Sequence, residues 1–259
     1  MRAHAIVLVL SAACGGSVAS SDGGADAAKS DATSFVDAGL DSADATASTL
    51  TFSGTTVISP GGTPLTQVTV CVFAHPELPC TTSDSAAHFS IGLPMDAETG
   101  ITLVRTGYAS VLLPLETAEL DETGYVIGLP TASSRTSLYA AFGATFPDST
   151  NGFVMLEGTQ SGQNELGLAG ATGALNPSSG TGPFYLDANG NAAPSATSTS
   201  TYSLIFFAGV PPSTYVGQLS PTSMSCFENF GGWTTSTIDG TRFPVAAGFE
   251  THVGLDCHM

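Results

Sequence analysis

Few residues in this 259-residue sequence have the types and spacing that catalysis requires. A serine hydrolase elbow has the form Gly-x-Ser-x-Gly and a zinc peptidase helix has the form His-Glu-x-x-His, and the sequence contains neither. His252 and Asp256 lie four residues apart in a segment rich in strand-forming residues, which places both on one strand face, but no nucleophile accompanies them. We interpret them as a surface pair and predict no catalytic residue.

The residues that could bind a metal ion also lack the spacing of known metal sites. His75 and His88 flank Cys80, but the sequence has no Cys-x-x-Cys or His-x-x-x-His pair of the kind that zinc sites use. Residues 187–191 (Asp-Ala-Asn-Gly-Asn) alternate oxygen ligands as a calcium loop does, yet the glycine is in the fourth position and no glutamate closes the loop. We interpret this segment as a β-turn and predict neither a metal nor another cofactor.

The single tryptophan lies in a glycine-rich loop. The segment Phe-Glu-Asn-Phe-Gly-Gly-Trp, residues 227–233, directly follows Cys226. Aromatic rings offer flat apolar faces to sugars or to partner loops. We therefore predict that Phe230 and Trp233 form a binding patch. The alternative is that a tryptophan beside a disulfide caps its own core.

The N-terminus has the pattern of an export signal. Arg2 precedes an apolar run over residues 5–10, and the small residues Ser11, Ala12 and Ala13 precede Cys14. This pattern resembles the signal of a bacterial lipoprotein, which implies a signal peptide over residues 1–13 and a lipid on Cys14 that attaches the protein to a membrane. The resemblance implies an extracytoplasmic protein, most simply an outer-membrane lipoprotein. The alternative is ordinary cleavage after Ala13, which would give a secreted protein.

The remaining four cysteines form an even set once Cys14 is assigned to the lipid. Four cysteines allow three pairings. Cys71 and Cys80 close a short loop, and Cys226 and Cys257 close a longer loop within the C-terminal segment. We favour these two disulfides, which suit an oxidising compartment.

The composition excludes several partners. The chain has 5 Lys and Arg against 22 Asp and Glu, for a formal net charge of −17. Nucleic-acid binding needs clustered basic residues, so we predict no nucleic-acid partner, and anionic lipid headgroups are disfavoured for the same reason. Beyond the signal, no stretch reaches the ~18 apolar residues that a spanning helix needs.

Residues 14–49 are rich in Asp, Ala, Ser and Gly, and they lack the apolar side chains that a core needs. We predict a disordered acidic spacer.

From Leu50 the composition changes to short runs of Val, Ile, Thr and Phe, separated by Gly, Pro or Asp, which predicts an all-β fold. The candidate strands of the first half are residues 50–58, 65–74, 87–93, 101–106, 108–115 and 125–129.

Several short motifs between residues 50 and 117 resemble one family. They are Pro-Gly-Gly-Thr-Pro-Leu at 60–65, Phe-Ser-Ile at 89–91, Leu-Pro at 93–94 and Gly-Tyr at 107–108. Together they resemble the carboxypeptidase regulatory-like, or transthyretin-like, module, which implies an Ig-like β-sandwich over residues 50–130. Because this module is a non-catalytic appendage of carboxypeptidases, the resemblance implies no peptidase activity.

A second module is predicted over residues 151–259. The pattern Phe89-x-x-Gly-Leu-Pro recurs 117 positions later as Phe206-x-x-Gly-Val-Pro, which indicates a diverged repeat of the first sandwich. The linker, residues 131–150, contains the one helical pattern, at 133–146, with a serine available as its N-cap. Its apolar stripe is expected to pack on a neighbouring sheet. The sequence thus predicts one or two small sandwiches joined by a short helix.

These observations predict a non-enzymatic lipoprotein of the cell envelope, acting as a structural or binding module toward an envelope polysaccharide or protein. The first alternative is a secreted carbohydrate-binding or adhesion protein without a lipid anchor. The second is an exported hydrolase, which would require a deep pocket that gathers His252 with acidic residues.

Overall fold

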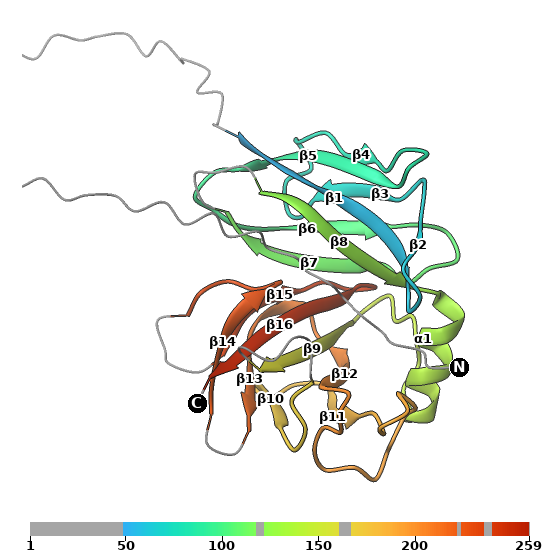
Figure 1. Cartoon of the computed structure of the whole chain (residues 1–259), viewed down its shortest axis with the longest axis vertical. Coiled ribbons are helices and arrows are strands. Elements are labelled where there is room, and N and C mark those ends of the chain that lie inside the picture. Colours follow the sequence, from blue (N-terminus) through green and yellow to red (C-terminus); the bar gives the residue numbers. More distant parts are fainter. Residues whose placement is uncertain (1–48, 118–121, 161–166, 222–223, 236–239, 259) are drawn as a thin grey trace, which may run out of the picture.

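The computed structural model describes residues 49–117, 122–160, 167–221, 224–235 and 240–258, and these form an all-β fold with one short helix (Figure 1). This confirms the predicted fold class. The predicted signal peptide, the lipidation site at Cys14 and the spacer up to residue 48 lie outside the described residues.

The first sandwich is built from two facing sheets. In one, the long strand β1 (Thr49–Ser59) pairs antiparallel with β5 (His88–Pro94) and parallel with β8 (Glu122–Pro130), and the short β2 (Thr63–Pro64) extends it. The facing strands are β7 (Val111–Glu116), β6 (Glu98–Val104), β3 (Thr69–Val72) and β4 (Thr81–Thr82). Each predicted strand of this half is thus present, with changed ends.

The core of this sandwich follows from the alternation of side chains along a strand. Phe52 on β1 and Phe89 on β5 are buried, and their exposed or half-buried neighbours in the sequence face outward. Their rings lie 6.0 Å apart between centroids. Apolar residues of the facing strands, such as Val70 and Leu103, complete the cluster.

The second sandwich also consists of two facing layers of strands. Strand β9 (Gly152–Gln160) pairs antiparallel with β12 (Leu204–Val210) and parallel with β16 (Glu250–His258). At the margins, β11 (Thr181–Tyr185) pairs with β12, and β14 (Ser225–Phe230) pairs with β16. The facing sheet has the order β10 (Thr172–Asn176), β13 (Ser213–Ser220) and β15 (Thr241–Val245).

The two sandwiches share one topology. In each, a central strand has an antiparallel and a parallel neighbour, giving β5-β1-β8 in the first and β12-β9-β16 in the second. The facing sheets likewise correspond as β3-β6-β7 and β10-β13-β15. The diverged repeat stays a prediction about ancestry, and this shared topology supports it.

The repeated sequence motif does not place its phenylalanines alike. Phe89 packs inside the first sandwich, whereas Phe206 points away from the second sandwich core and packs under the helix. The cause is a register shift between Phe207 and Val210, where Gly209 adopts a φ of 63°. Since side chains alternate, a shift of one residue moves a side chain to the opposite face.

A continuous sheet joins the two sandwiches. Strands β7 and β16 pair in parallel, with Glu250 opposite Val111 and Thr251 opposite Leu112. The resulting sheet runs from β11 through β12, β9, β16, β7 and β6 to β4. The upper and lower halves in Figure 1 therefore share a backbone hydrogen-bonded layer at their boundary, in addition to the chain that connects them.

Helix α1 (Ala132–Ala141) covers the outer face of the second sandwich. Its N-cap is Thr131, whose side chain accepts a hydrogen bond from the backbone N–H of Ser134, so the predicted serine cap is wrong. The helix ends before Gly143, which adopts a φ of 77° that favours glycine. As predicted, the aromatic stripe packs on a sheet: Tyr139, Phe142 and Phe146 are buried with Phe153 and Phe206.

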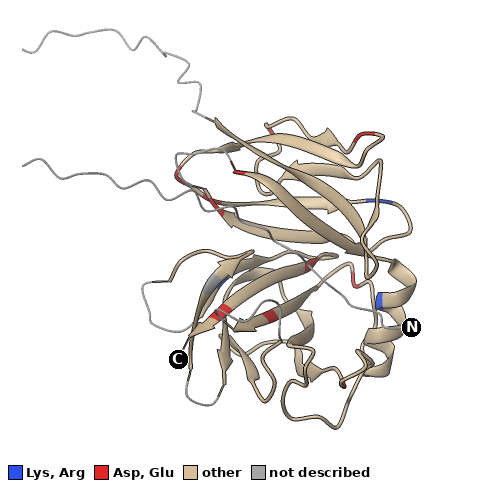
Figure 2. Ribbon diagram, in the orientation of Figure 1, with Lys and Arg blue, Asp and Glu red and all other residues tan. Residues whose placement is uncertain are grey.

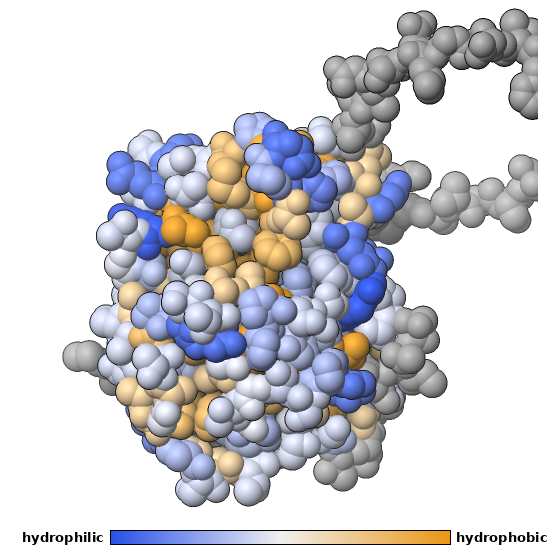
Figure 3. Space-filling model, turned by 180° about the vertical axis from the view of Figure 1, so that it is seen from behind, coloured by the Kyte–Doolittle hydropathy of each residue, from blue (hydrophilic) through white to orange (hydrophobic). Residues whose placement is uncertain are grey.

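The surface carries few charges. Figure 2 shows that the described Lys and Arg residues lie at separate positions along the chain. From behind, most of the surface is weakly polar, with apolar side chains gathered mainly over the first sandwich (Figure 3). None of the helices among the described residues is long and apolar enough to cross a membrane.

Candidate functional site

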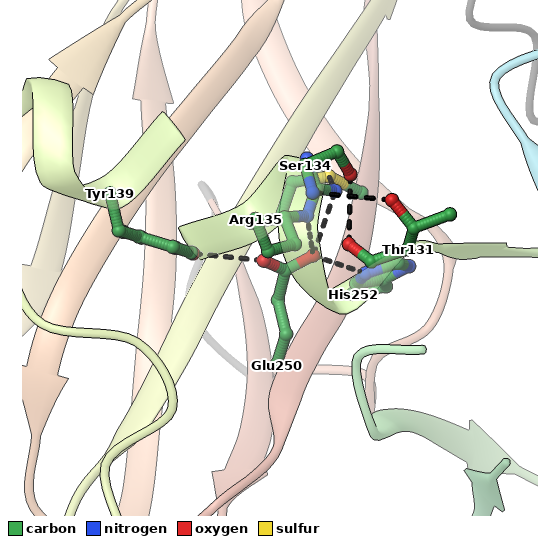
Figure 4. Close-up of polar contacts among 7 residues, drawn as sticks. Thr131, Ser134, Arg135, Tyr139, Glu250 and His252 are labelled. Atoms are coloured by element: carbon green, nitrogen blue, oxygen red, sulfur yellow. Dashed lines mark hydrogen bonds and ion pairs between the residues drawn. The ribbon is translucent and has the colours of Figure 1, made fainter. Parts of the chain in front are cut away.

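A buried charged cluster lies where the helix meets the shared sheet (Figure 4). The Glu250 side chain is fully buried, and its Oε1 lies 2.8 Å from a guanidinium nitrogen of Arg135 and 2.7 Å from Nε2 of His252. The Tyr139 hydroxyl donates to Glu250 Oε2 at 2.9 Å. Because an ionised carboxylate only accepts hydrogen bonds, Nε2 of His252 carries the hydrogen in this pair.

The elements of the fold explain this convergence. Glu250 and His252 are two residues apart on β16, so both side chains project from the same face of the sheet. Arg135 and Tyr139 are four residues apart on α1, so both project from one face of the helix. The helix lies against that sheet face, and Arg135 also stacks over the ring of Phe206 at 5.3 Å.

The electrostatics of the cluster favour an ion pair. Burial by itself raises the pKa of Glu250, but the charge of Arg135, the hydrogen bond from His252 and the hydrogen bond from Tyr139 outweigh it and lower the pKa to about 2. Burial, aided by the charge of Glu250, raises the pKa of the Tyr139 hydroxyl well above its ordinary value. The cluster therefore holds a carboxylate, a guanidinium and a neutral phenol at neutral pH.

A cavity of about 370 Å³ lies beside this cluster. Helix α1 forms one wall with Arg135 and Leu138, and the sheet forms another with Met155, Glu157 and His252. Residues from 186–192 and 202–204 and from the ends of β1 and β8 complete the lining. The size is that of a site for a small molecule.

One oxygen of Glu157, a residue that lines this cavity, has no hydrogen-bond partner among the described residues. The residue is half-buried, its Oε2 atom is closed off from solvent, and no described residue donates a hydrogen bond to that atom. Burial raises the pKa of Glu157 to about 7. A carboxyl group of this kind is a candidate for ligand binding, since it has an unmet need for a donor.

The prediction that His252 and Asp256 form a surface pair is wrong. His252 is buried and bonds to Glu250, whereas Asp256 lies 3.3 Å from the exposed His258 and contacts Thr159. Sequence reasoning missed Glu250 and Glu157. A signal was present, because only 10% of the residues are charged and Glu157 directly follows the apolar run of residues 153–156, while Glu250 directly follows Phe249.

Trp233 packs in the contact between the two sandwiches. Its ring is buried, and its indole N–H donates to the backbone oxygens of Thr99 at 2.9 Å and Leu115 at 3.1 Å, which belong to β6 and β7. Arg242 stacks on the ring at 5.6 Å. Phe230 is half-buried and packs against the first core. This packing corrects the predicted patch, because the indole is committed to the contact between the halves.

The predicted disulfides are confirmed. Cys71 bonds to Cys80 and Cys226 bonds to Cys257. The segment at Asp187 is a turn, as interpreted, because Asp187 Oδ1 accepts hydrogen bonds from the backbone N–H groups of Asn189 and Asn191. Within the described ranges, no group of three or more His, Cys, Asp or Glu residues could hold a metal ion.

Neither a protein-family model nor a curated protein sequence matches the chain. Solved structures that resemble it include the TIE protein of Bacillus anthracis, at 11% identity and a TM-score of 0.27, covering 82% of this chain and 34% of that one. The minor pilin GBS52 of Streptococcus agalactiae is 13% identical with a TM-score of 0.28, covering 81% and 95%. The shaft pilin SpaA of Lactobacillus rhamnosus GG is 11% identical with a TM-score of 0.24, covering 81% and 98%. The chain thus spans about a third of the TIE protein, and the fold assignment rests on the strands described above.

Proposed function

We propose that the protein is a non-enzymatic module of the bacterial cell envelope, which presents a stiff pair of β-sandwiches outside the cytoplasm. The observation that carries this proposal is the shared sheet, in which β7 and β16 pair across the boundary of the two halves. Domains connected only by a linker move relative to one another, whereas a continuous sheet with a buried ion pair at its joint resists bending. Such a body suits a structural or binding role.

The disulfides support an address outside the cytoplasm. Both bridges join cysteines within one sandwich, and bonds of this kind persist in oxidising compartments. In this proposal the signal over residues 1–13 directs export, Cys14 carries the lipid, and the acidic segment that follows separates the sandwiches from the membrane surface. Without the lipid, the same body would act as a secreted carbohydrate-binding or adhesion protein.

The charged cluster supports a role without catalysis. His252 is the side chain best suited to act as a base, but its hydrogen-bond partner is the carboxylate of Glu250, and no serine or cysteine among the described residues hydrogen-bonds to it. A nucleophile needs such a contact with its base. Arg135, Tyr139 and Glu250 likewise satisfy one another, which is the arrangement of a structural ion pair.

The test is the non-reduced intact mass of the protein isolated from native membranes, with and without thiol alkylation. A chain that begins at Cys14 with a diacyl or triacyl increment, and with four cysteines that resist alkylation, is the expected result. An unlipidated chain that begins at or after Cys14 would favour the secreted alternative. A hydrolytic activity on ester, glycoside or peptide substrates that is lost in His252→Asn would overturn the non-enzymatic role.

A further inference from the structure

Within the part of the chain that the structure describes, the cavity beside helix α1 is lined by one acidic residue, Glu157, and its Oε2 atom lacks a hydrogen-bond donor. Arg135 and His252 also line this cavity, but both are bonded to Glu250. The charge of Arg135 is thus already balanced inside the protein. Glu157 lies on the neighbouring strand β9, and no described residue provides a donor for its buried Oε2 atom. The cavity therefore lacks a hydrogen-bond donor for this oxygen, and a positively charged donor would also balance the charge of Glu157 once it is ionised.

The walls of the cavity favour an organic group. Leu138 of α1, Leu186 and Leu204 contribute apolar surface, and the ring of Tyr202 lies at the same lining. Asn189 and Asn191 contribute amide groups from the turn that Asp187 holds in place. A bare metal ion does not fit this lining, because Glu157 is a single carboxylate and metal sites need several such ligands.

We propose that this cavity binds a small primary ammonium compound, with its nitrogen at the carboxyl group of Glu157 and its carbon skeleton along the apolar wall. An ammonium group offers three donors and a compensating charge, and a carboxylate is acceptor-only when ionised. An anionic ligand lacks a free cation here, because Arg135 is paired with Glu250. This inference goes beyond the proposed function and does not depend on a lipid or an envelope partner.

The binding should depend on pH in a defined direction. The ammonium ligand stays protonated throughout, while Glu157 must ionise to receive it, and burial raises the pKa of Glu157 to about 7. Binding is therefore expected to tighten as the pH rises from 6 to 8.5. The other titratable groups around this cavity and on its surrounding elements are Arg135, Tyr139, Asp187, Tyr202, Glu250 and His252.

The experiment is a calorimetric titration of the mature chain with n-butylammonium, and in parallel with 1-butanol as the neutral compound of matched shape. At pH 8.5, n-butylammonium is expected to bind about tenfold more tightly than 1-butanol, or better. Glu157→Gln should lower the affinity for n-butylammonium to that for 1-butanol. Asp96→Asn is the matched control, because it removes one carboxylate from an exposed turn of the first sandwich and should leave binding unchanged.

Three outcomes would overturn the proposal: equal affinity for the two compounds, no saturable binding of n-butylammonium, or full binding by Glu157→Gln. A thermal unfolding scan of each variant shows whether it is folded. If Glu157→Gln does not fold, the pH dependence of n-butylammonium affinity in the unchanged chain decides instead, and a flat profile contradicts the role of Glu157. The ligand is also recovered after the titration and analysed. Recovery of unchanged n-butylammonium keeps this test separate from the test of the non-enzymatic role, whereas chemical conversion of the ligand would overturn that role.

Discussion

The guanidinium of Arg135 lies 2.8 Å from the carboxylate of Glu250, although 115 residues separate the two in the sequence. Arg135 belongs to the helix between the sandwiches, and Glu250 begins the strand that joins the sheet of the second sandwich to that of the first. The ion pair therefore ties the helix to the strand at the joint between the two halves.

Replacing Arg135 with methionine should strongly destabilise the protein. Methionine keeps much of the apolar stem but removes the charge, which leaves the carboxylate of Glu250 buried without its main counter-ion. We expect a loss of about 3–5 kcal/mol in the free energy of unfolding, measured by urea denaturation at pH 7. Arg105→Met is the control, because among the described residues the guanidinium of Arg105 stacks on Tyr108 and forms no ion pair, and it should lose less than about 1 kcal/mol. Similar losses in both variants would contradict a specific role for the ion pair.

Acid should weaken the same joint. The folded state lowers the pKa of Glu250 from 4.5 to about 2, so its ionisation contributes stability above the unfolded pKa, and this contribution is lost as the pH falls from about 4.5 to about 2. Glu250→Gln should therefore be much less stable than the unchanged chain at pH 7, and the gap should narrow below pH 4. Urea midpoints of both proteins across this range measure the effect. A gap that is independent of pH would show that the charge of Glu250 is not what stabilises the joint.

Glu157 should have the opposite effect on stability. Burial raises its folded pKa to about 7, so between about 4.5 and 7 the unfolded chain releases a proton that the folded chain retains. The free energy of unfolding should thus fall as the pH rises through this window. Glu157→Gln removes this loss, and we expect its advantage over the unchanged chain to be larger at pH 8 than at pH 5. Chemical denaturation at the two pH values measures it, and an equal difference at both would contradict the raised pKa.

The two disulfides should contribute unequally. Cys226 and Cys257 are separated by 31 positions and Cys71 and Cys80 by 9, and the entropy removed from the unfolded chain grows with loop length. Replacing Cys226 and Cys257 by alanines should destabilise the protein by roughly 1 kcal/mol more than replacing Cys71 and Cys80. Urea denaturation of the two double variants measures the difference. The reverse order would indicate that packing around the bridges outweighs the loop entropy.

Trp233 should stabilise the folded protein through its indole N–H group as well as through its buried ring. Trp233→Phe keeps an aromatic ring but leaves the backbone oxygens of Thr99 and Leu115 without this donor, and we expect a loss of about 1–3 kcal/mol. Trp233→Ala removes the buried ring as well and should cost about 3–5 kcal/mol. Both variants lack tryptophan, so their stability is measured by urea denaturation followed by circular dichroism. In the unchanged chain, the emission of Trp233 should lie at shorter wavelength when the protein is folded than when it is unfolded, and this tests its burial. Solvent-like emission from the folded protein would contradict its burial.

The parts of the fold that depend on local pattern could be predicted from the sequence. Alternation of apolar residues located β1 and β5, helical spacing located the aromatic stripe of α1, and an even set of four cysteines led to the correct disulfides. The turn at Asp187 also follows from local chemistry, because the carboxylate and the backbone groups that it accepts from are within four residues. In each case, the interacting residues or their periodicity are visible within one segment.

The tertiary structure alone decided how the segments meet. Parallel pairing of β7 with β16 unites residues more than a hundred positions apart, and no local pattern specifies that register. The same pairing buries Glu250 beside the helix that carries Arg135, and it moves His252 from a predicted surface pair into the buried cluster. The burial of Trp233 depends on backbone oxygens from the other sandwich. The sequence determined the elements because their causes are local, whereas the site depends on which faces become covered, and only the packing of the whole chain settles this.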